Sequence, residues 1–468
     1  MITRRVDVAV IGAGSAGLRA YRAAKKETAN VVLIEGGPYG TTCARVGCMP
    51  SKLLIAAAEA AHGAAEAHRF GIDVEGIEVN GRAVMDRVRR ERDRFVGFVV
   101  EGTEKIPGED RIRGYAQFVD DHELIVDDHT SIIADRVVIA TGSRPAYPSR
   151  WNELGDRLIV NDDIFDWEDL PSSVAVFGPG VIGLELGQAL ARLGVQVRLF
   201  GLGGKVGPLS DERVMAAARE AMQSEFLLDP NANVSRLERT EEGVAIDYED
   251  QDGVVQTALV DFVIAATGRT PNVDKLKLEN TSLPLDERGV PVFDENTMQI
   301  GRSHVFIAGD VDNDRPLLHE AADEGDIAGR NAGRFPAVEP GARRSPLAVV
   351  FSDPQIAMVG ARLADLDERD VAVGEVSFED QGRARVMLKN QGLLRVYADC
   401  RTGRFLGAEM VGPGAEHIGH LLAWAHQAGL TITEMLEMPF YHPVIEEGLR
   451  TALREAQKGV GHCLRVAA

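Results

Sequence analysis

The stretch 6–26, VDVAVIGAGSAGLRAYRAAKK, joins an apolar run to three glycines in a GxGxxG pattern and then to an alanine-rich segment. This order predicts a buried β-strand over 6–11 that leads directly into a helix. Glycines are needed there because the turn is tight and the backbone must approach a pyrophosphate. A second apolar run ends in Glu35, about 20 residues further on, where a carboxylate can bind ribose hydroxyls. The stretch predicts a dinucleotide-binding unit that uses Gly12, Gly14, Gly17 and Glu35.

The same pattern returns over 171–200, PSSVAVFGPGVIGLELGQALARLGVQVRLF, with Gly178, Gly180 and Gly183 at the glycine positions. Two further strand-like runs, at 136–142 and 261–268, both end in Ala-Thr-Gly and flank this second unit. Small-residue turns of this kind let a ligand approach the backbone. We therefore expect an outer dinucleotide domain over 1–150 and 268–335, with a second one, 151–267, inserted into it.

A third domain is expected over 345–468. The segment 331–346 is rich in Gly, Pro and Arg and predicts a linker. After it, strand-like runs at 347–353, 385–390, 393–399 and 405–412 favour an antiparallel sheet, with helices over 416–426 and 443–457. The expected fold class is α/β, with two Rossmann-like domains, one inserted in the other, and a C-terminal α+β domain.

Composition excludes several functional classes. The 468 residues include 51 Lys and Arg against 72 Asp and Glu, a net charge of −21, which argues against nucleic-acid binding. No apolar run reaches the roughly 18 residues that a membrane span requires. Four cysteines are too few for an oxidised secreted framework, so we expect a cytoplasmic protein.

Two of those cysteines lie close together, in TTCARVGCMPSK at 41–52. On a regular helix, Cys43 and Cys48 would be about 7.5 Å apart along the axis, whereas a disulfide needs Cα atoms about 4.4 to 6.8 Å apart. Gly47 could allow the distorted turn that a bridge requires. The alternative is two unrelated reduced thiols. A metal site is less favoured, because no second pair with ligand spacing accompanies them.

Near the other end, the segment FYHPVIEE at 440–447 places His442 shortly before a predicted helix. Its acids could simply complement the helix dipole. Alternatively, a carboxylate could orient His442 as a general base that exchanges protons with a thiol.

Taken together, these motifs closely resemble those of the flavin-dependent pyridine-nucleotide disulfide reductases, over residues 5 to about 455. Within that family the best match is to the dihydrolipoamide dehydrogenases. The resemblance implies one FAD per subunit and NAD or NADP as co-substrate. The residues implied to lie at the FAD are Gly12, Gly14, Gly17, Glu35, Thr42, Lys52, Ala116, Thr141, Gly142 and Asp310. Those implied to line the nicotinamide nucleotide site are Gly178, Gly180, Gly183 and Gly268.

The resemblance also implies the catalytic groups. Cys48 would be the thiol next to the flavin, and Cys43 the thiol that exchanges with substrate. Lys52 and Glu185 would form an ion pair beside the flavin. His442 and Glu447 would form an acid/base pair that reaches the disulfide of the other subunit, which implies a homodimer formed through the third domain.

Three departures from the family pattern concern the site. Thr41 stands where the family's Gly-Gly-Thr-Cys has its second glycine, and Ala44-Arg45 replaces the usual Leu-Asn. Phe440 replaces the first histidine of the family's HxHPTxxE, and Val444 its threonine. Gly201 stands where an NAD-specific relative has a ribose-binding acid. Nearby Lys205 could meet a 2′-phosphate, although the sequence alone favours the simpler interpretation of a surface lysine. The choice between NAD and NADP therefore stays open.

The expected function is a dithiol/disulfide oxidoreductase that passes electrons between a dihydrolipoyl group, a Cys43–Cys48 disulfide, FAD and NAD(P). Its expected partners are a small dithiol or disulfide, or a lipoyl-bearing protein. One alternative is an NADPH-dependent reductase of another small disulfide, metal ion or oxidant. Another is a structural subunit of a multienzyme complex with incidental diaphorase activity.

Overall fold

The computed structural model of the chain describes residues 1–250 and 252–467, and the side chains of 368 and 463–467 lie outside that description. The chain forms two compact units. Unit 1 consists of Met1–Leu53, Asp86–Ala146 and Gly268–Arg344. Unit 2 consists of Leu54–Met85, Tyr147–Thr267 and Ser345–Ala468.

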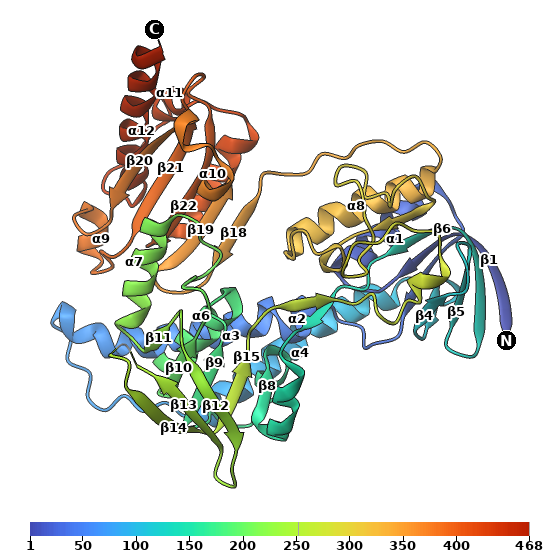
Figure 1. Cartoon of the computed structure of the whole chain (residues 1–468), viewed down its shortest axis with the longest axis horizontal. Helices are drawn as coiled ribbons and strands as arrows, with labels where there is room; N and C mark the ends of the chain where they lie inside the picture. Colours follow the sequence, from blue (N-terminus) through green and yellow to red (C-terminus); the bar gives the residue numbers. More distant parts are fainter. Residues whose placement is uncertain (251, 468) are drawn as a thin grey trace. The chain divides into compact units, whose positions relative to one another are not determined.

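Unit 1 holds the first dinucleotide pattern (Figure 1). Its strands are β1 (Ile2–Ile11), β2 (Val31–Glu35), β3 (Arg111–Arg113), β4 (Ala116–Phe118), β5 (Glu123–Val126), β6 (Thr130–Ile139), β7 (Ser143–Pro145), β16 (Arg269–Pro271) and β17 (Val305–Ile307). Its helices are α1 (Ser15–Glu27), α2 (Thr42–Val46) and α8 (Leu318–Arg334), together with the first residues of α3 (Cys48–Ala65) and most of α4 (Gly81–Glu104).

The main sheet of unit 1 has the order β3-β2-β1-β6, and β17 pairs with β6. These pairings are parallel, with Val10 opposite Leu33 on one side of β1 and Val138 on the other. The segments of these strands at the centre of the sheet, 8–11, 31–34 and 137–139, are apolar and fully buried, as expected where both faces of a parallel sheet are covered. β17 brings residues 305–307 to the same sheet as β1, far away in the sequence.

Helices α1 and α8 pack closely because small residues line both of them. A Cβ on Gly325 of α8 would collide with the carbonyl oxygen of Ala16 on α1, and a Cβ on Gly329 would collide with that of Ala20. The two helices lie side by side in Figure 1. This contact fixes the start of α1, where the GxGxxG glycines lie, against the segment that follows β17.

Unit 2 holds the second dinucleotide pattern and the C-terminal sheet. Its strands are β8 (Leu158–Val160), β9 (Ser173–Phe177), β10 (Gln196–Phe200), β11 (Leu227–Asp229), β12 (Val234–Arg239), β13 (Val244–Glu249), β14 (Val255–Val260), β15 (Phe262–Ala265), β18 (Leu347–Val350), β19 (Gln355–Gly360), β20 (Val371–Ser377), β21 (Leu393–Asp399) and β22 (Phe405–Gly412). Its helices are α5 (Asn161–Ile164), α6 (Val181–Arg192), α7 (Glu212–Gln223), α9 (Gly382–Val386), α10 (Ala415–Gln427), α11 (Ile432–Leu436) and α12 (Glu446–Ala467).

The second dinucleotide pattern lies in a parallel sheet of order β11-β10-β9-β15-β8, and β12 to β14 form a small antiparallel sheet. The C-terminal sheet, of order β18-β19-β22-β21-β20, is antiparallel throughout. Residues of α10, α11 and α12, such as Ile418, Met435 and Leu453, are buried in one core with this sheet. The predicted fold class, two Rossmann-like units and a C-terminal α+β unit, is confirmed.

Three local predictions were wrong. The predicted strand 385–390 does not form, because Gln381 caps the short helix α9 by accepting from the Ala384 amide, and Leu388 has a positive φ of 54°. The predicted linker begins later than 331, since α8 continues to Arg334. The last helix begins at Glu446 rather than at 443, and the Val444 amide instead donates to the Glu447 carboxylate.

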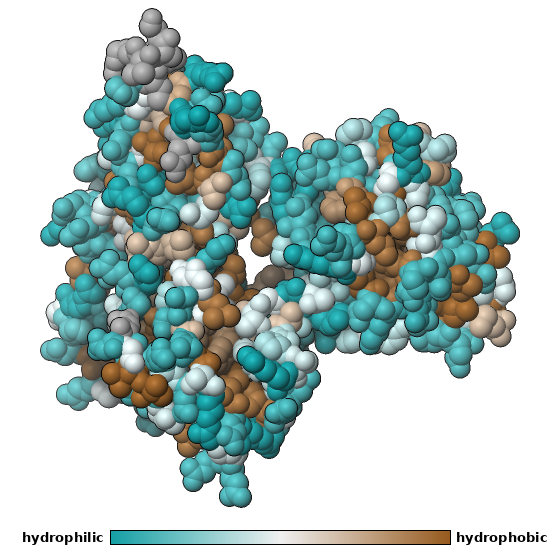
Figure 2. Space-filling view, viewed as in Figure 1, coloured by the Kyte–Doolittle hydropathy of each residue, from teal (hydrophilic) through white to brown (hydrophobic). Residues whose placement is uncertain are grey.

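Hydrophilic residues cover most of the surface visible in Figure 2. Among the described residues, no helix is long and apolar enough to cross a membrane.

Candidate functional site

The first GxGxxG turn in unit 1 has the geometry of a pyrophosphate cradle. Gly12 donates to the Ile34 carbonyl oxygen at 2.8 Å and has a φ of +106°, and a Cβ there would collide with the Ala140 carbonyl. Gly14 precedes α1 with no side-chain cap, and the space beside it is open for 4 Å. The first amides of α1 can therefore bind an anion. These residues fit the diphosphate of FAD.

Glu35 lies at the end of β2, next to this turn. Its carboxylate accepts hydrogen bonds from the Ala13 amide and the Gly37 amide, each at 2.7 Å. These two bonds fix the carboxylate beside the cradle, where it could bind ribose hydroxyls of the same dinucleotide. The ring of Tyr115 covers Gly36, since a Cβ there would lie 2.5 Å from it. No motif in the sequence indicates the contact of Tyr115 with Gly36, and in the structure Tyr115 is a large exposed aromatic residue.

A second group of predicted FAD residues meets in unit 1 around Asp310. Asp310 accepts a hydrogen bond from the Ser143 hydroxyl at 2.8 Å, and Arg269 donates to that hydroxyl at 2.8 Å. Thr141 donates to the Asn272 carbonyl at 2.8 Å. The two Ala-Thr-Gly turns are thus joined by Ser143, Arg269 and Asn272. Sequence analysis did not single out these three residues, although each follows such a turn closely.

The remaining FAD predictions have different surroundings. Gly142 has a φ of +66° and open space around its Cα. Thr42 is the exposed first residue of α2. Ala116 is buried in the core of the unit 1 sheet. The binding role of each stays a prediction.

An acidic pair that sequence analysis missed lies below the Gly309–Asp310 turn. Glu324 accepts from the Gly309 amide at 2.8 Å and from Arg343 at 2.7 Å. Burial, and then the negative charge of Glu324, raise the pKa of the neighbouring Asp312 to about 8. The carboxyl of Asp312 is therefore mainly protonated at neutral pH.

The two redox cysteines lie on either side of a helix break in unit 1. Cys43 belongs to α2, Cys48 begins α3, and Gly47 separates the helices with φ −129° and ψ −116°. Neither cysteine forms a disulfide in this structure, and Cys43 is half-buried while Cys48 is exposed. The hydrogen bond that the Cys43 thiol donates to the Cys48 sulfur, then burial and the negative charge of Cys48, raise the pKa of Cys43 far above its usual value. The Cys48 amide and the Lys52 ammonium lower it by less. The helix is therefore broken at Gly47, and a disulfide between Cys43 and Cys48 stays a prediction.

His442 and Glu447 are hydrogen-bonded in unit 2. His442 Nδ1 lies 2.9 Å from Glu447 Oε2, and Arg450 donates to Glu447 Oε1 at 2.8 Å. Partial burial would raise the pKa of Glu447, but the bonds from His442 and Val444 outweigh it and lower the pKa below its usual value. Phe440 packs under the Arg450 guanidinium, with 5.6 Å to the ring centre. An exposed imidazole oriented by a carboxylate can act as a general base.

The second glycine turn, in unit 2, repeats the geometry of the first. Gly178 donates to the Phe200 carbonyl at 2.8 Å with a φ of +110°, and Gly180 precedes α6 with open space beside it. A Cβ on Gly183 would collide with the Gly178 carbonyl. Gly268 has a φ of +130°, with open space around it, and begins the return to unit 1. The three glycines of unit 2 fit a second dinucleotide, and a binding role for Gly268 stays a prediction.

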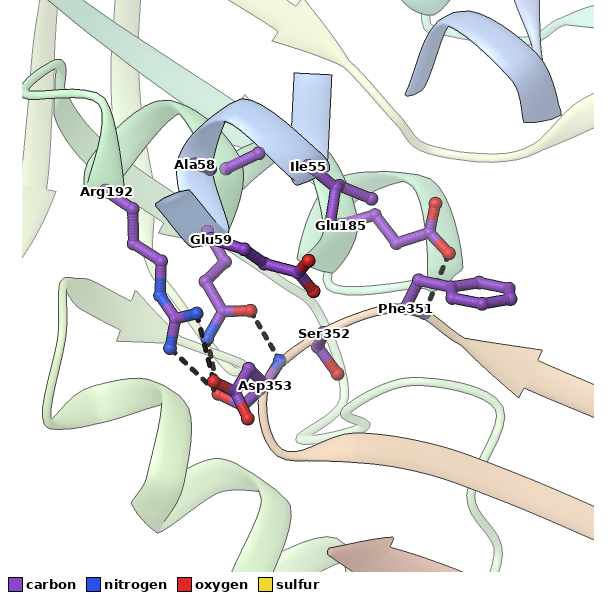
Figure 3. A pocket seen from close by; sticks show the side chains of 10 residues that line it. Ile55, Ala58, Glu59, Glu185, Arg192, Phe351, Ser352 and Asp353 are labelled. Atoms are coloured by element: carbon purple, nitrogen blue, oxygen red, sulfur yellow. Dashed lines mark hydrogen bonds and ion pairs between the residues drawn. The ribbon is translucent and has the colours of Figure 1, made fainter. Parts of the chain in front are cut away.

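The predicted partners Lys52 and Glu185 belong to different units. Lys52 donates to the Ser51 hydroxyl at 3.4 Å. Glu185 is buried and accepts from the Phe351 amide at 2.9 Å. It lines an open cavity of about 210 Å³ with Ile55, Arg192 and Asp353 (Figure 3). The ion pair between Lys52 and Glu185 stays a prediction. In the part of the chain that the structure describes, no cluster of three metal-ligating side chains is found.

Comparisons with known proteins agree with this geometry. Residues 6–325 match the family model "pyridine nucleotide-disulphide oxidoreductase", and 347–453 match the dimerisation domain of that family. The chain is 30% identical to dihydrolipoyl dehydrogenase 2 of Haloarcula marismortui, covering 98% of both chains. It is 29% identical to a dihydrolipoyl dehydrogenase of Bacillus subtilis, covering 96% of this chain and 98% of that one.

Among solved structures, the HOCl-induced flavoprotein disulfide reductase RclA of Escherichia coli matches with a TM-score of 0.78 and 24% identity, over 96% of this chain and 99% of that one. At that identity the match shows the fold. The dimerisation domain supports a homodimer. The chain belongs to the pyridine nucleotide-disulphide oxidoreductase family and is an FAD-dependent disulfide oxidoreductase that uses NAD(P).

Proposed function

We propose that the enzyme is a dihydrolipoyl dehydrogenase, which oxidises a dihydrolipoyl group and reduces a nicotinamide nucleotide. The observation that carries this proposal is the hydrogen-bonded thiol pair of Cys43 and Cys48, on either side of a helix break. The substrate class is supported by the full-length relatives, which are named dihydrolipoyl dehydrogenases.

The proposed chemistry begins with the oxidised Cys43–Cys48 pair. His442, held by Glu447, takes the proton from one substrate thiol, and the resulting thiolate attacks Cys43 Sγ. The bond between the two enzyme sulfurs breaks, and Cys48 leaves as a thiolate. The second substrate thiol loses its proton to solvent, and its sulfur attacks the substrate sulfur of the mixed disulfide. Cys43 leaves and takes the proton held by His442, so the substrate leaves as a disulfide. Two electrons are now held by the enzyme dithiol.

Bound FAD would supply the two-electron chemistry that links this dithiol to the nicotinamide nucleotide. Gly12, Gly14 and Glu35 would hold its diphosphate and ribose, and Asp310 would lie at the second group of contacts. We propose that His442 and Glu447 act on the disulfide of the partner subunit. A lipoyl-bearing protein is the proposed partner. A cytoplasmic location is proposed because four cysteines are too few for an oxidised secreted framework.

The test is an anaerobic half-reaction. The FAD-loaded protein is reduced with NADH or with NADPH, lipoamide is added, and the flavin spectrum is followed. We expect a long-wavelength charge-transfer band from the Cys48 thiolate, which disappears rapidly when lipoamide is added. Cys43→Ser should retain FAD and its reduction by the nucleotide, but lose reoxidation by lipoamide. Full lipoamide activity in that variant would refute the proposal.

A second candidate is a reductase of another small disulfide, metal ion or oxidant. Thr41, Ala44 and Arg45 favour it, because they change the redox loop on the substrate side. The matched Escherichia coli reductase is described as HOCl-induced and has been solved as a Cu(II) complex. A charge-transfer band that persists after addition of lipoamide, but disappears with another disulfide or oxidant, would select this candidate. Loss of flavin reduction by both nucleotides would favour a structural role.

A further inference from the structure

The two glycine turns can be compared residue by residue. In unit 1 the Gly12 amide donates to the Ile34 carbonyl, and in unit 2 the Gly178 amide donates to the Phe200 carbonyl, each at 2.8 Å. Since Ile34 corresponds to Phe200, the next residues also correspond, and Gly201 occupies the position of Glu35. By the same count, Pro179 occupies the position of Ala13.

The two residues that form the predicted ribose contact in the first turn, Ala13 and Glu35, are both replaced in the second. In the first, the Ala13 amide donates to Glu35 Oε2 at 2.7 Å and fixes the carboxylate. Pro179 has no amide hydrogen to donate. Gly201 has no carboxylate to accept from it. The unit 2 site has lost the donor and the acceptor together.

Position 201 is also closed to any side chain. A Cβ there would lie 2.6 Å from Pro179 Cγ, and 2.8 Å from both Pro179 Cδ and the Pro230 carbonyl oxygen. The backbone is held in place, because the Gly201 amide donates to the Asp229 carbonyl at 2.7 Å and the Ala232 amide donates to the Gly201 carbonyl at 3.0 Å. The turn therefore excludes the acid that would bind a 2′-hydroxyl and repel a 2′-phosphate.

The loop that follows carries one charge. Residues 201–210, GLGGKVGPLS, contain no Asp or Glu, and Lys205 is exposed. Lys205 has no ion-pair partner in the described structure. Asp211, six residues further on, is bonded to Arg395 and Tyr397, and Asp229, at the end of β11, accepts from the Asn231 amide. The exposed Glu212 begins α7 and forms no ion pair with Lys205 in the described structure. The ammonium of Lys205 is thus available to an anion.

We propose that this site accepts the 2′-phosphate of NADP(H), and that Lys205 is the residue that selects it. This proposal deepens the proposed function and rests on its nucleotide-dependent flavin reduction. NADPH would be oxidised at least as efficiently as NADH, because the Pro179 and Gly201 pair removes discrimination against the phosphate and Lys205 attracts it.

The experiment is stopped-flow reduction of the FAD-loaded enzyme by NADPH and by NADH, each over a range of concentrations. In Lys205→Glu, the second-order rate constant for NADPH should fall tenfold or more, while that for NADH changes less than threefold. Lys205→Arg should retain the NADPH rate. Lys26→Glu, an equal charge change at an exposed position in α1, should leave the ratio of the two rates unchanged.

Two results would overturn the proposal. One is a wild-type second-order rate constant that is higher for NADH than for NADPH. The other is an unchanged NADPH to NADH ratio in Lys205→Glu. Flavin reduction requires no disulfide substrate, so an enzyme inactive toward lipoamide would contradict the proposed function and leave this test intact.

Discussion

His442 Nδ1 and Glu447 Oε2 lie 2.9 Å apart, and Arg450 donates a hydrogen bond to the other oxygen of Glu447. The imidazole is therefore hydrogen-bonded to a carboxylate that Arg450 holds in place. The lowered pKa of Glu447 keeps it ionised well into the acidic range, where it still orients the histidine. Glu447→Gln should therefore lower kcat for disulfide exchange by about tenfold or more, and His442→Gln by about a hundredfold or more. Flavin reduction by the nucleotide should stay unchanged in both variants. An equal loss of flavin reduction would indicate a structural role instead.

The thiol pair makes a second prediction. The hydrogen bond that the Cys43 thiol donates to the Cys48 sulfur is the largest cause of the raised pKa of Cys43. In Cys48→Ala this bond is absent, so Cys43 should become a thiolate at a lower pH than in the reduced wild-type enzyme. The rate of alkylation of Cys43 by iodoacetamide as a function of pH measures this change. Burial would still raise the pKa of Cys43, so a partial decrease is expected, and a profile that is unchanged or moves to higher pH would contradict the assignment.

Much of the fold could be predicted because its signals are local. Val6 to Gly17 encode a strand, a turn and a helix start within a dozen residues, and the same is true of the second glycine turn. The failed strand at 385–390 shows the limit of such signals. Its apolar residues fit a strand, yet the Gln381 cap and the positive φ of Leu388 produce a helix and a turn.

In the site, too, some residues could be predicted from the sequence and others could not. Motifs indicated Cys43, Cys48, Glu35 and His442, because each lies in a short pattern with a known chemistry. Ser143 could not be found in this way, because its role arises only when Asp310 and Arg269 meet it from distant parts of the chain. Asp312 was missed for the same reason, since Glu324 becomes its neighbour only after folding.

Thr41 provides a prediction about strain in the redox loop. It has φ 58° and ψ 151°, a region that favours glycine and that a β-branched residue rarely adopts. Thr41→Gly should relieve this strain, but it also removes the hydroxyl that accepts from the Ala44 amide at 3.4 Å. The net result should be a free energy of unfolding about 1 kcal/mol higher. Thr41→Ala, the matched control, loses the hydroxyl but keeps the Cβ, so it should lower stability. Thermal unfolding of both variants tests this, and a less stable glycine variant would refute it.

Asp312 predicts a dependence of stability on pH. Burial, and then the charge of Glu324, raise its pKa to about 8, so the folded state binds a proton that the unfolded state releases near pH 4. Stability from this group is present at low pH and is lost as the pH rises toward 8. Asp312→Asn retains the neutral form, so its thermal midpoint should fall less between about pH 5 and 8 than that of the wild type. Parallel pH curves for the two proteins would show that Asp312 does not hold the proton.

Pro179 and Gly201 should behave as a coupled pair. Gly201→Glu alone places a side chain against the Pro179 ring, so it should weaken binding of both nucleotides rather than create a preference for NADH.

Pro179→Ala removes the ring and restores an amide donor, as in the Ala13 and Glu35 pair. In the double variant, the backbone still has to absorb the close contact with the Pro230 carbonyl. We nevertheless expect NADH to be favoured over NADPH by about tenfold, because a carboxylate then binds the 2′-hydroxyl and repels a 2′-phosphate. Flavin-reduction rates for the two single variants and the double variant measure this coupling. Purely additive effects would show that the two positions act independently.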